Sequence, residues 1–356
     1  MVREPLMRWV DDVEESQHSL IGAKMARLGT LRRLGLLVPD GFAVPAEVFV
    51  DVVHRSDIRE EIDREIAAIA DPGDIVSITA ASGRIRQLVE SATIPTNFEA
   101  SLGDAYEELC FRYGEVDVSV AVRSSAIGED AAVASFAGQY ESYLGVCGTE
   151  AVLVAVRRAW SSLFVSRALV YRLERRQHFA QTPMGVGVLR LVPARCAGVA
   201  FSAHPVTGAR DRIVIEGSWG WGEAVVQGRV QPDHIEVDKG DGRILTSVIA
   251  DKRIISAFDS AAGQITERPM PARFRNSPCL TQEMVDAIRE ATCTAERHFC
   301  RPVDMEWVVE RGWRPGNAVT IVQVRPITAL VDSPPGHEVP KWDPLSYAGK
   351  YGLGVR

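Results

Sequence analysis

The stretch from residue 116 to residue 139 constrains the fold of this chain most, because it joins a strand pattern to a loop with anion-binding chemistry. Valine alternates with smaller or polar residues over 116–122 (VDVSVAV), and this period of two predicts a half-buried strand. A loop rich in serine, alanine and glycine is predicted to begin at Arg123 and to run to residue 139. A guanidinium fork and the backbone N–H groups of such a loop can both reach phosphate oxygens. We therefore expect a strand followed by a phosphate-binding loop, with a plain turn as the alternative.

The length of 356 residues exceeds that of one ordinary hydrophobic core and predicts two lobes. Hydrophobic residues make up 46% of the chain and charged residues 24%, which is the balance of a globular protein that folds in water. No window approaches the roughly 18 apolar residues of a membrane helix, so we expect a cytoplasmic protein without a membrane partner. The net charge of -7 argues against general nucleic-acid binding, and the six cysteines lack zinc-site spacing.

Lys24 stands at a glycine turn that opens a predicted helix. Apolar residues recur at helical spacing over 25–34, and Gly35 is suited to end the helix. The N-terminus of a helix favours anions, and an ammonium group beside it adds to that preference. This pattern predicts that Lys24 binds phosphate, and an ordinary surface lysine is the alternative.

Two strand patterns, over 303–309 and 319–325, are joined by a loop containing glycine and proline and predict a β-hairpin. Period two puts the polar residues of each strand on one face, so pairing lets four of them converge. These four residues are Asp304, Glu306, Gln323 and Arg325. Oxygen ligands at this density suit Mg²⁺, which takes one or two carboxylates together with substrate phosphates. The arginine would stabilise charge on a transferring phosphoryl group, whereas a salt-bridged surface hairpin is the alternative.

Other segments are expected to form a helix and strands of the scaffold and a turn that contacts a ligand. Residues 152–176 have the pattern of one long helix with an aromatic stripe, and residues 185–192 and 198–201 read as adjacent strands. A glycine-rich turn over 217–222 would let the backbone approach a ligand closely. Glu223 follows this turn and could accept a hydrogen bond from ribose hydroxyls or from an amine.

Together these motifs resemble the nucleotide-binding domain of the phosphoenolpyruvate synthase and pyruvate phosphate dikinase family, which has an ATP-grasp fold. The similarity extends over about residues 20–330 and rests on strings such as VAVRSSAIGED, ASFAGQYESYLGV, SWGWGEAVVQG, DMEWVVE and IVQVRPIT. It implies an α+β protein of two ATP-grasp lobes with the nucleotide between them. The expected domains are an N-terminal lobe over 1–190, a C-terminal lobe over 191–330, and a linker and tail over 331–356.

The resemblance also implies the roles of individual residues toward ATP and Mg²⁺. The catalytic residues it implies are Arg325, Arg123 and Lys24, of which the last two position the phosphates. The metal ligands it implies are Glu306 and Gln323, with Asp304 nearby. The loop containing Ser135 and Gly138 would cover the phosphates, the backbone at Leu189 would hold adenine, and Glu223 would face the ribose or adenine. Family members carry glutamine where Leu189 stands here, which leaves nucleotide selectivity open.

Full-length members of the family continue into a swivelling domain whose histidine is phosphorylated, and none of the seven histidines here has that context. The resemblance therefore predicts the ATP-binding subunit of a split dikinase, which transfers a phosphoryl group from Mg·ATP to a histidine on a separate subunit and releases AMP and phosphate. Phenylphosphate synthase, which phosphorylates phenol, is the best-known similar system. The alternatives are the detached ATP-binding module of a phosphoenolpyruvate synthase, an antibiotic phosphotransferase, and a subunit that senses ATP without turning it over. The final acceptor, the stoichiometry, the release of AMP rather than ADP, and the role of the tail are left open.

Overall fold

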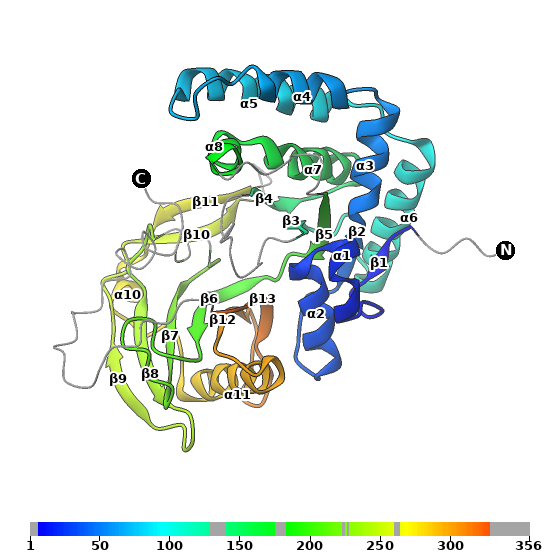
Figure 1. Cartoon of the computed structure of the whole chain (residues 1–356). Helices are drawn as coiled ribbons and strands as arrows, with labels where there is room; N and C mark the ends of the chain where they lie inside the picture. The colour runs from blue at the N-terminus through cyan, green and yellow to red at the C-terminus, as the bar shows by residue number, and fades with distance from the viewer. Residues whose placement is uncertain are drawn as a thin grey trace. The chain divides into compact units, whose positions relative to one another are not determined.

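A computed structural model describes residues 6–127, 140–174, 183–222, 225, 228–259 and 264–327 (Figure 1). The chain divides into two compact units. Unit 1 comprises Met1–Gly29 and Asp40–Leu191, and unit 2 comprises Thr30–Pro39 and Val192–Arg356. Each unit contains its own sheet and its own helices, so the two are described separately. The lobe boundaries expected from the sequence stay a prediction.

Unit 1 is built on a five-stranded sheet in the order β1-β2-β5-β3-β4, with antiparallel neighbours throughout. Its strands are β1 (Arg8–Trp9), β2 (Gly41–Val44), β3 (Val120–Ala126), β4 (Ser142–Val146) and β5 (Met184–Arg190). Strand β3 pairs on both sides, with β4 and with β5. It is therefore an inner strand, and all of its residues except Arg123 are buried.

The predicted position of this strand was wrong by about four residues. Residues 116–122 were expected to form it, but Val116 is 93% exposed and the strand runs from Val120 to Ala126. Arg123, Ser124 and Ser125 consequently belong to the strand and do not begin a loop. Pairing with β5 continues through Ala126, and these backbone hydrogen bonds outweigh the polar character of the side chains.

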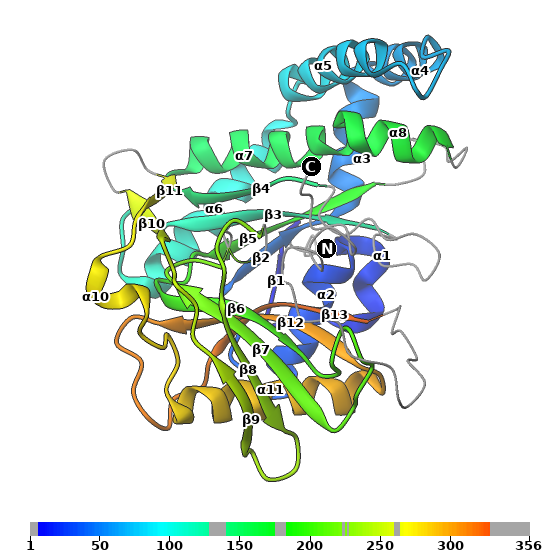
Figure 2. The same cartoon turned by 90° about the vertical axis from the view of Figure 1, so that its left-hand side faces the viewer.

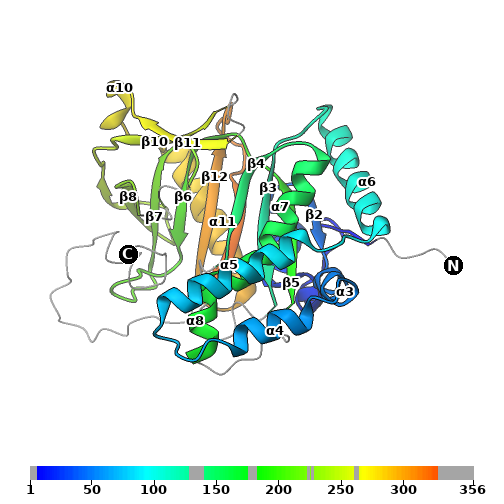
Figure 3. The same cartoon turned by 90° about the horizontal axis from the view of Figure 1, so that it is seen from above.

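Four helices of unit 1 form two layers over one face of the sheet, with α7 and α8 next to the sheet and α4 and α5 beyond them. Helix α7 packs on β3, β4 and β5, and α5 packs on α7 and α8, as Figures 2 and 3 show. The helical segments, of which α2 continues past Gly29 into the residues of unit 2, are η1 (Glu15–Gln17), α1 (His18–Ile21), α2 (Ala23–Arg33), α3 (Ala46–Arg55), α4 (Arg59–Ala67), α5 (Ile75–Ser91), α6 (Thr96–Tyr113), α7 (Thr149–Ser161), η2 (Ser162–Phe164) and α8 (Ser166–Glu174). The amphipathic pattern places the apolar side of each packed helix against its neighbours.

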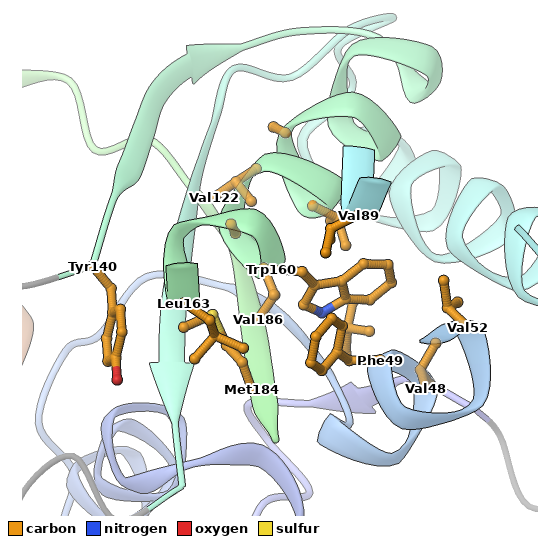
Figure 4. Packing of buried hydrophobic residues seen from close by; sticks show 14 of the residues in the cluster. Val48, Phe49, Val52, Val89, Val122, Tyr140, Trp160, Leu163, Met184 and Val186 are labelled. Atoms are coloured by element: carbon orange, nitrogen blue, oxygen red, sulfur yellow. The ribbon is translucent and has the colours of Figure 1, made fainter. Parts of the chain in front are cut away.

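Trp160 lies at the centre of the hydrophobic core of unit 1. Its ring is fully buried, and its centroid lies 5.8 Å from that of Phe49 and 5.7 Å from that of Phe98 (Figure 4). The single long helix expected over 152–176 was wrong, because a 3-10 turn and the extended residue Val165 separate α7 from α8. Ser82 in α5 donates a hydrogen bond to the carbonyl of Phe164, which holds this break against the neighbouring helix.

Unit 2 is built on a six-stranded antiparallel sheet in the order β13-β12-β6-β7-β8-β9. Its strands are β6 (Ala194–Phe201), β7 (Arg212–Trp219), β8 (Asp233–Asp238), β9 (Ile244–Val248), β12 (Val303–Glu310) and β13 (Thr320–Pro326). A separate hairpin consists of β10 (Ile254–Asp259) and β11 (Gln264–Pro269). Helix α11 (Gln282–Phe299) packs on one face of the sheet, and a short helix, α10 (Ala272–Arg275), precedes it.

Two general expectations can be compared with this architecture. The mixed helix and sheet content confirms the α+β class. The strands expected over 185–192 and 198–201 are confirmed as β5 and β6, which follow one another in the chain and pair within different sheets. Among the described residues, no helix is long and apolar enough to cross a bilayer.

Candidate functional site

The candidate phosphate site of unit 1 begins at Gly22, which separates α1 from α2. Gly22 has a φ of +81°, a left-handed conformation that favours glycine. A Cβ at this position would lie 2.0 Å from the carbonyl oxygen of Ser125. Only glycine therefore allows the first turn of α2 to pack directly against the end of β3.

This packing brings Lys24 to the strand that carries Arg123. The Lys24 Nζ donates a hydrogen bond of 3.3 Å to the carbonyl oxygen of Ser124, and the Met25 N–H lies 3.5 Å from the hydroxyl oxygen of Ser125. The sequence separates these contacts by 100 residues. Lys24 thus lies beside the residue that follows Arg123, at the N-terminal end of a helix whose first N–H groups favour negative charge.

Arg123 occupies the middle of β3, opposite Ser142 of β4 and Gly187 of β5. It is the one residue of the strand that keeps partial solvent access. An ammonium group, a partly exposed guanidinium group and a helix N-terminus form a donor set suited to phosphate oxygens. The phosphate-binding roles of Lys24 and Arg123 stay predictions.

Among the other residues predicted to contact the nucleotide, Leu189 is the one that the structure describes. Leu189 lies in β5, is 2% exposed, and pairs in register with Gly41 and Ala121, so its side chain belongs to the core. Its predicted role toward adenine rests on backbone groups alone. Ser135, Gly138 and Glu223 lie outside the described residues.

In unit 2 the predicted hairpin is confirmed as β12 paired antiparallel with β13. Asp304 lies directly opposite Arg325, and Glu306 directly opposite Gln323. Directly paired residues share a face of an antiparallel sheet, so the four side chains converge as the period-two pattern indicated. A β-bulge follows between Glu306 and Trp307 and ends this regular register.

Arg325 holds the carboxylate of Asp304. The Nε and one terminal nitrogen of Arg325 each lie 2.7 Å from Oδ2 of Asp304, whose side chain is 9% exposed. Burial raises the pKa of Asp304 above its usual range, the charge of Arg325 opposes this rise, and the charge of Glu306 adds to it. The pair is therefore a buried ion pair on one rung of the hairpin, next to the Glu306 and Gln323 rung.

The hairpin has the donor chemistry of a hard cation site. Two carboxylates and one amide oxygen are available from Asp304, Glu306 and Gln323. Mg²⁺ commonly binds through one or two carboxylates and takes its remaining ligands from water and substrate phosphates. Across the ranges that the structure covers, no three His, Cys, Asp or Glu residues gather closely enough to hold a metal by themselves. The set thus fits a magnesium ion shared with a phosphate ligand.

The glycine-rich turn after β7 is fixed at two points. Gly220 has a φ of +82°, and a Cβ there would lie 2.1 Å from the carbonyl oxygen of Ser256 in β10. The Trp221 N–H donates to the same carbonyl at 3.3 Å, and its indole N–H donates to the carbonyl of Val192 at 3.1 Å. Gly220 is therefore required by the close approach of another strand of the protein, and the predicted approach of this turn to a ligand stays a prediction.

Sequence reasoning missed several partners of these residues. The carbonyls of Ser124 and Ser256 hold Lys24 and Trp221, and a backbone acceptor leaves no residue-type signal in a sequence. Sequence reasoning also missed that Glu216 of β7 lies opposite His234 of β8 with Glu236 close by, although Glu216 within the apolar run IVIEGSW was a visible exception. His204 lies in a turn, where its ring Nδ1 accepts hydrogen bonds from the N–H groups of Val206 and Thr207.

A model of the family described as pyruvate phosphate dikinase, AMP/ATP-binding domain, matches residues 18–341. A probable phosphoenolpyruvate synthase of Methanothermobacter thermautotrophicus is 36% identical over 329 residues, which are 92% of this chain and 47% of that relative. A probable phosphoenolpyruvate synthase of Methanocaldococcus jannaschii is 35% identical over 322 residues, 90% of this chain and 26% of the relative. The phosphoenolpyruvate synthase of Pyrococcus furiosus is 32% identical over 368 residues, 93% of this chain and 45% of the relative. The chain therefore spans about half, or less, of the length of these relatives.

Proposed function

The chain belongs to the pyruvate phosphate dikinase AMP/ATP-binding domain family, and from this membership we propose that it binds Mg·ATP and starts a dikinase-type phosphoryl transfer. In this half-reaction a histidine nitrogen receives the β-phosphoryl group of ATP as the bond between the α- and β-phosphates breaks and AMP leaves. Water breaks the bond between the β- and γ-phosphates and supplies the remaining oxygen of the released phosphate. The nucleotide-binding part is proposed to have the ATP-grasp arrangement that the sequence motifs implied.

The observation that carries the proposal is the register of the β12–β13 hairpin. Glu306 faces Gln323 and Asp304 faces Arg325, so oxygen ligands and a fixed guanidinium group lie on consecutive rungs of one sheet face. Glu306 and Gln323 would hold Mg²⁺, which neutralises charge on the phosphates when it is bound. Arg325 would stabilise the charge that develops on the transferring phosphoryl group. The contact with Asp304 keeps the guanidinium group oriented in advance.

Unit 1 supports the same chemistry with a separate donor set. Lys24 at the start of α2 and Arg123 in β3 would contact phosphate oxygens of ATP. Ser135 and Gly138 would belong to the loop over the phosphates, and Glu223 would face the ribose or adenine. Leu189 would contribute backbone groups toward adenine and no side-chain amide.

We propose that the acceptor histidine lies outside the matched residues, on a partner polypeptide or in a further domain, because the relatives extend well beyond the region that they share with this chain. The relatives named phosphoenolpyruvate synthase favour an acceptor chemistry of that kind. Phenol as the final acceptor finds no support among these relatives. Isolation of the partner together with this chain would identify the acceptor.

Substitutions at Arg325 and Lys24 separate the two proposed roles. Arg325→Ala should lower phosphoryl transfer on the order of a thousandfold, far more than it weakens ATP binding, because Arg325 acts mainly on charge that develops in the transition state. Lys24→Ala should weaken ATP binding as well, because its ammonium group contacts the ground-state phosphates. Binding is measured by titration calorimetry and transfer by quenched-flow assay, both at a temperature where each variant is folded.

Arg253→Ala provides the matched control, because Arg253 is an exposed arginine of unit 2 that pairs with Asp251 on the surface. It should leave both quantities unchanged. Equal losses in binding and turnover for Arg325→Ala would contradict the assignment of Arg325. Tight ATP binding by the wild type without any transfer would favour an ATP-sensing role.

A further inference from the structure

Strand β9 (Ile244–Val248) forms one edge of the sheet of unit 2 and has no part in the function proposed above (Figure 2). Strand β8 pairs with one side of β9, and among the residues that the structure describes no strand pairs with its other side. At the opposite edge of the sheet, the backbone N–H of Ile321 in β13 donates a hydrogen bond to the carbonyl of Leu37, which covers part of that edge. The outer side of β9 is therefore the edge to which a further strand could be added.

The side chains of this edge are apolar and exposed. Four large apolar residues within 244–249 are exposed, and Val248, at 54%, is the most exposed of the four, which are Ile244, Leu245, Val248 and Ile249. The segment ILTSVI contains no charged residue and no proline, with which proteins commonly block an exposed edge strand. A β-bulge at Leu245 interrupts the pairing with β8, so the regular part of the strand is 246–248. Exposed apolar residues on an unpaired edge are typical of a site where another strand binds.

The charged residues that flank β9 make the strand complementary to an antiparallel copy of itself. The sequence over 241–253 is DGRILTSVIADKR. In a two-fold antiparallel ladder one residue faces its own copy, because the two kinds of rung alternate along the strand. With Ser247 at this centre, Arg243 faces Asp251. Asp241 then faces Arg253, so both ends of the strand meet an opposite charge.

The same charges disfavour the neighbouring registers. A centre one residue earlier would place Asp241 opposite Asp251. A centre one residue later would place Arg243 opposite Arg253, and directly opposed like charges are destabilising. Within one chain, Asp251 already forms ion pairs with Arg253 and Arg275, so these three residues at the end of the strand carry a net positive charge. This charge favours the approach of Asp241 from a second copy.

We propose that the outer edge of β9 binds the same edge of a second copy of this chain, antiparallel and centred on Ser247, so that the sheets of unit 2 join across the contact. Each copy contributes the same strand, which makes the contact isologous and closes it as a dimer. In this register Leu245 faces Ile249 of the second copy, which buries part of the exposed apolar surface. Because the regular ladder is short, we expect a weak dimer with a dissociation constant in about the micromolar range.

A lysine at the centre of the edge tests where the two copies meet. Sedimentation velocity of the wild type over about 1–100 µM should show monomer converting to dimer as the concentration rises. Val248→Lys places a charge in the middle of the ladder twice in each dimer, so this variant should stay monomeric. Val116→Lys is the matched control, because Val116 is 93% exposed in unit 1 and lies outside any strand, and it should dimerise as the wild type does. Circular dichroism verifies that each variant is folded.

Charge reversal tests the antiparallel register. Asp241→Arg and Arg253→Asp should each raise the dissociation constant of the dimer about tenfold or more, because two attractive pairs become repulsive. The double variant D241R/R253D should recover most of the wild-type affinity. These two residues lie at opposite ends of β9, so within one chain they are far apart and only a second copy can bring them together.

The proposal is overturned if the wild type is still monomeric at about 100 µM, or if Val248→Lys dimerises as the wild type does. A dimer that is weakened by both charge reversals and not restored in the double variant would contradict the register. If a charge-reversal variant does not fold, the comparison of Val248→Lys with Val116→Lys carries the test alone. All of these measurements are made without ATP, so their outcome is independent of the function proposed above.

Discussion

Removal of Arg325 should destabilise unit 2, because the buried carboxylate of Asp304 then loses the guanidinium group with which it forms an ion pair. Breaking a buried ion pair by deleting one partner costs about 3–5 kcal/mol. The Arg325 side chain is 22% exposed, and water can therefore replace part of its contribution. We expect Arg325→Ala to lower the free energy of unfolding by about 2–4 kcal/mol near neutral pH. The double variant D304N/R325A should recover part of this loss, because no charge then remains buried.

The loss of stability in Arg325→Ala should also depend on pH, and its direction follows from the pKa of Asp304. Burial already raises the pKa of Asp304, and the charge of Arg325 is what opposes the rise. Without Arg325 this pKa rises further, so the folded variant prefers the protonated carboxyl. A group with a raised folded-state pKa contributes stability below its unfolded pKa of about 3.9, and this stability is lost as the pH rises through the folded pKa. The variant should therefore be closest to the wild type in acid and furthest from it at neutral pH.

Urea unfolding followed by circular dichroism, at about pH 4.5 and about pH 7.5, measures both effects. Arg253→Ala removes an exposed arginine from a surface ion pair and should leave the midpoint unchanged at both values. An Arg325→Ala midpoint equal to that of the wild type at neutral pH would refute the reasoning. If the free energy of unfolding falls equally at both pH values, the loss arises from packing and not from the unpaired charge of Asp304.

Two further predictions concern unit 1. Gly22→Ala should cost about 3 kcal/mol or more, because the new Cβ would lie 2.0 Å from the Ser125 carbonyl at a φ of +81°. Gly35→Ala, at a φ of +79° with no atom within 4 Å of the new Cβ, should cost only about 1–2 kcal/mol, and equal losses in thermal unfolding would contradict the role of the close approach. Trp160→Ala should cost about 3–5 kcal/mol in urea unfolding, because it leaves a cavity beside Phe49, and a loss below about 1 kcal/mol would contradict its central place in the core.

The parts of the fold that the sequence predicted well are those where a local pattern and the tertiary environment agree. The β12–β13 hairpin was predicted together with the residues that share its face, because apolar and polar residues alternate over 303–306 and over 322–325, and Val303, Met305 and Val324 on the other face are buried. Helix α2 and its end at Gly35 followed from apolar spacing and from the left-handed conformation that glycine adopts there. The family resemblance was confirmed by the match over residues 18–341.

The errors occur where contacts between distant parts of the chain, or a short break in a helix, are not visible in the local sequence pattern. Arg123 to Ser125 look like the start of a loop, but β5 pairs with all three residues and β4 also pairs with Arg123. The break between α7 and α8 is invisible to helical spacing, because residues 162–164 keep a helical turn and the apolar stripe continues. The contact of Lys24 with the carbonyl of Ser124 joins segments 100 residues apart, and no local pattern encodes it.

The most direct test of the proposed function is the fate of the β-phosphate of ATP. The protein is purified together with the chains that accompany it, incubated with Mg²⁺ and ATP labelled at the β-phosphate, and separated by electrophoresis. The account predicts acid-labile, base-stable label on a second polypeptide, AMP as a product, and loss of both in the Arg325→Ala variant. Bound ATP with no labelled chain and no AMP would contradict the phosphotransferase function.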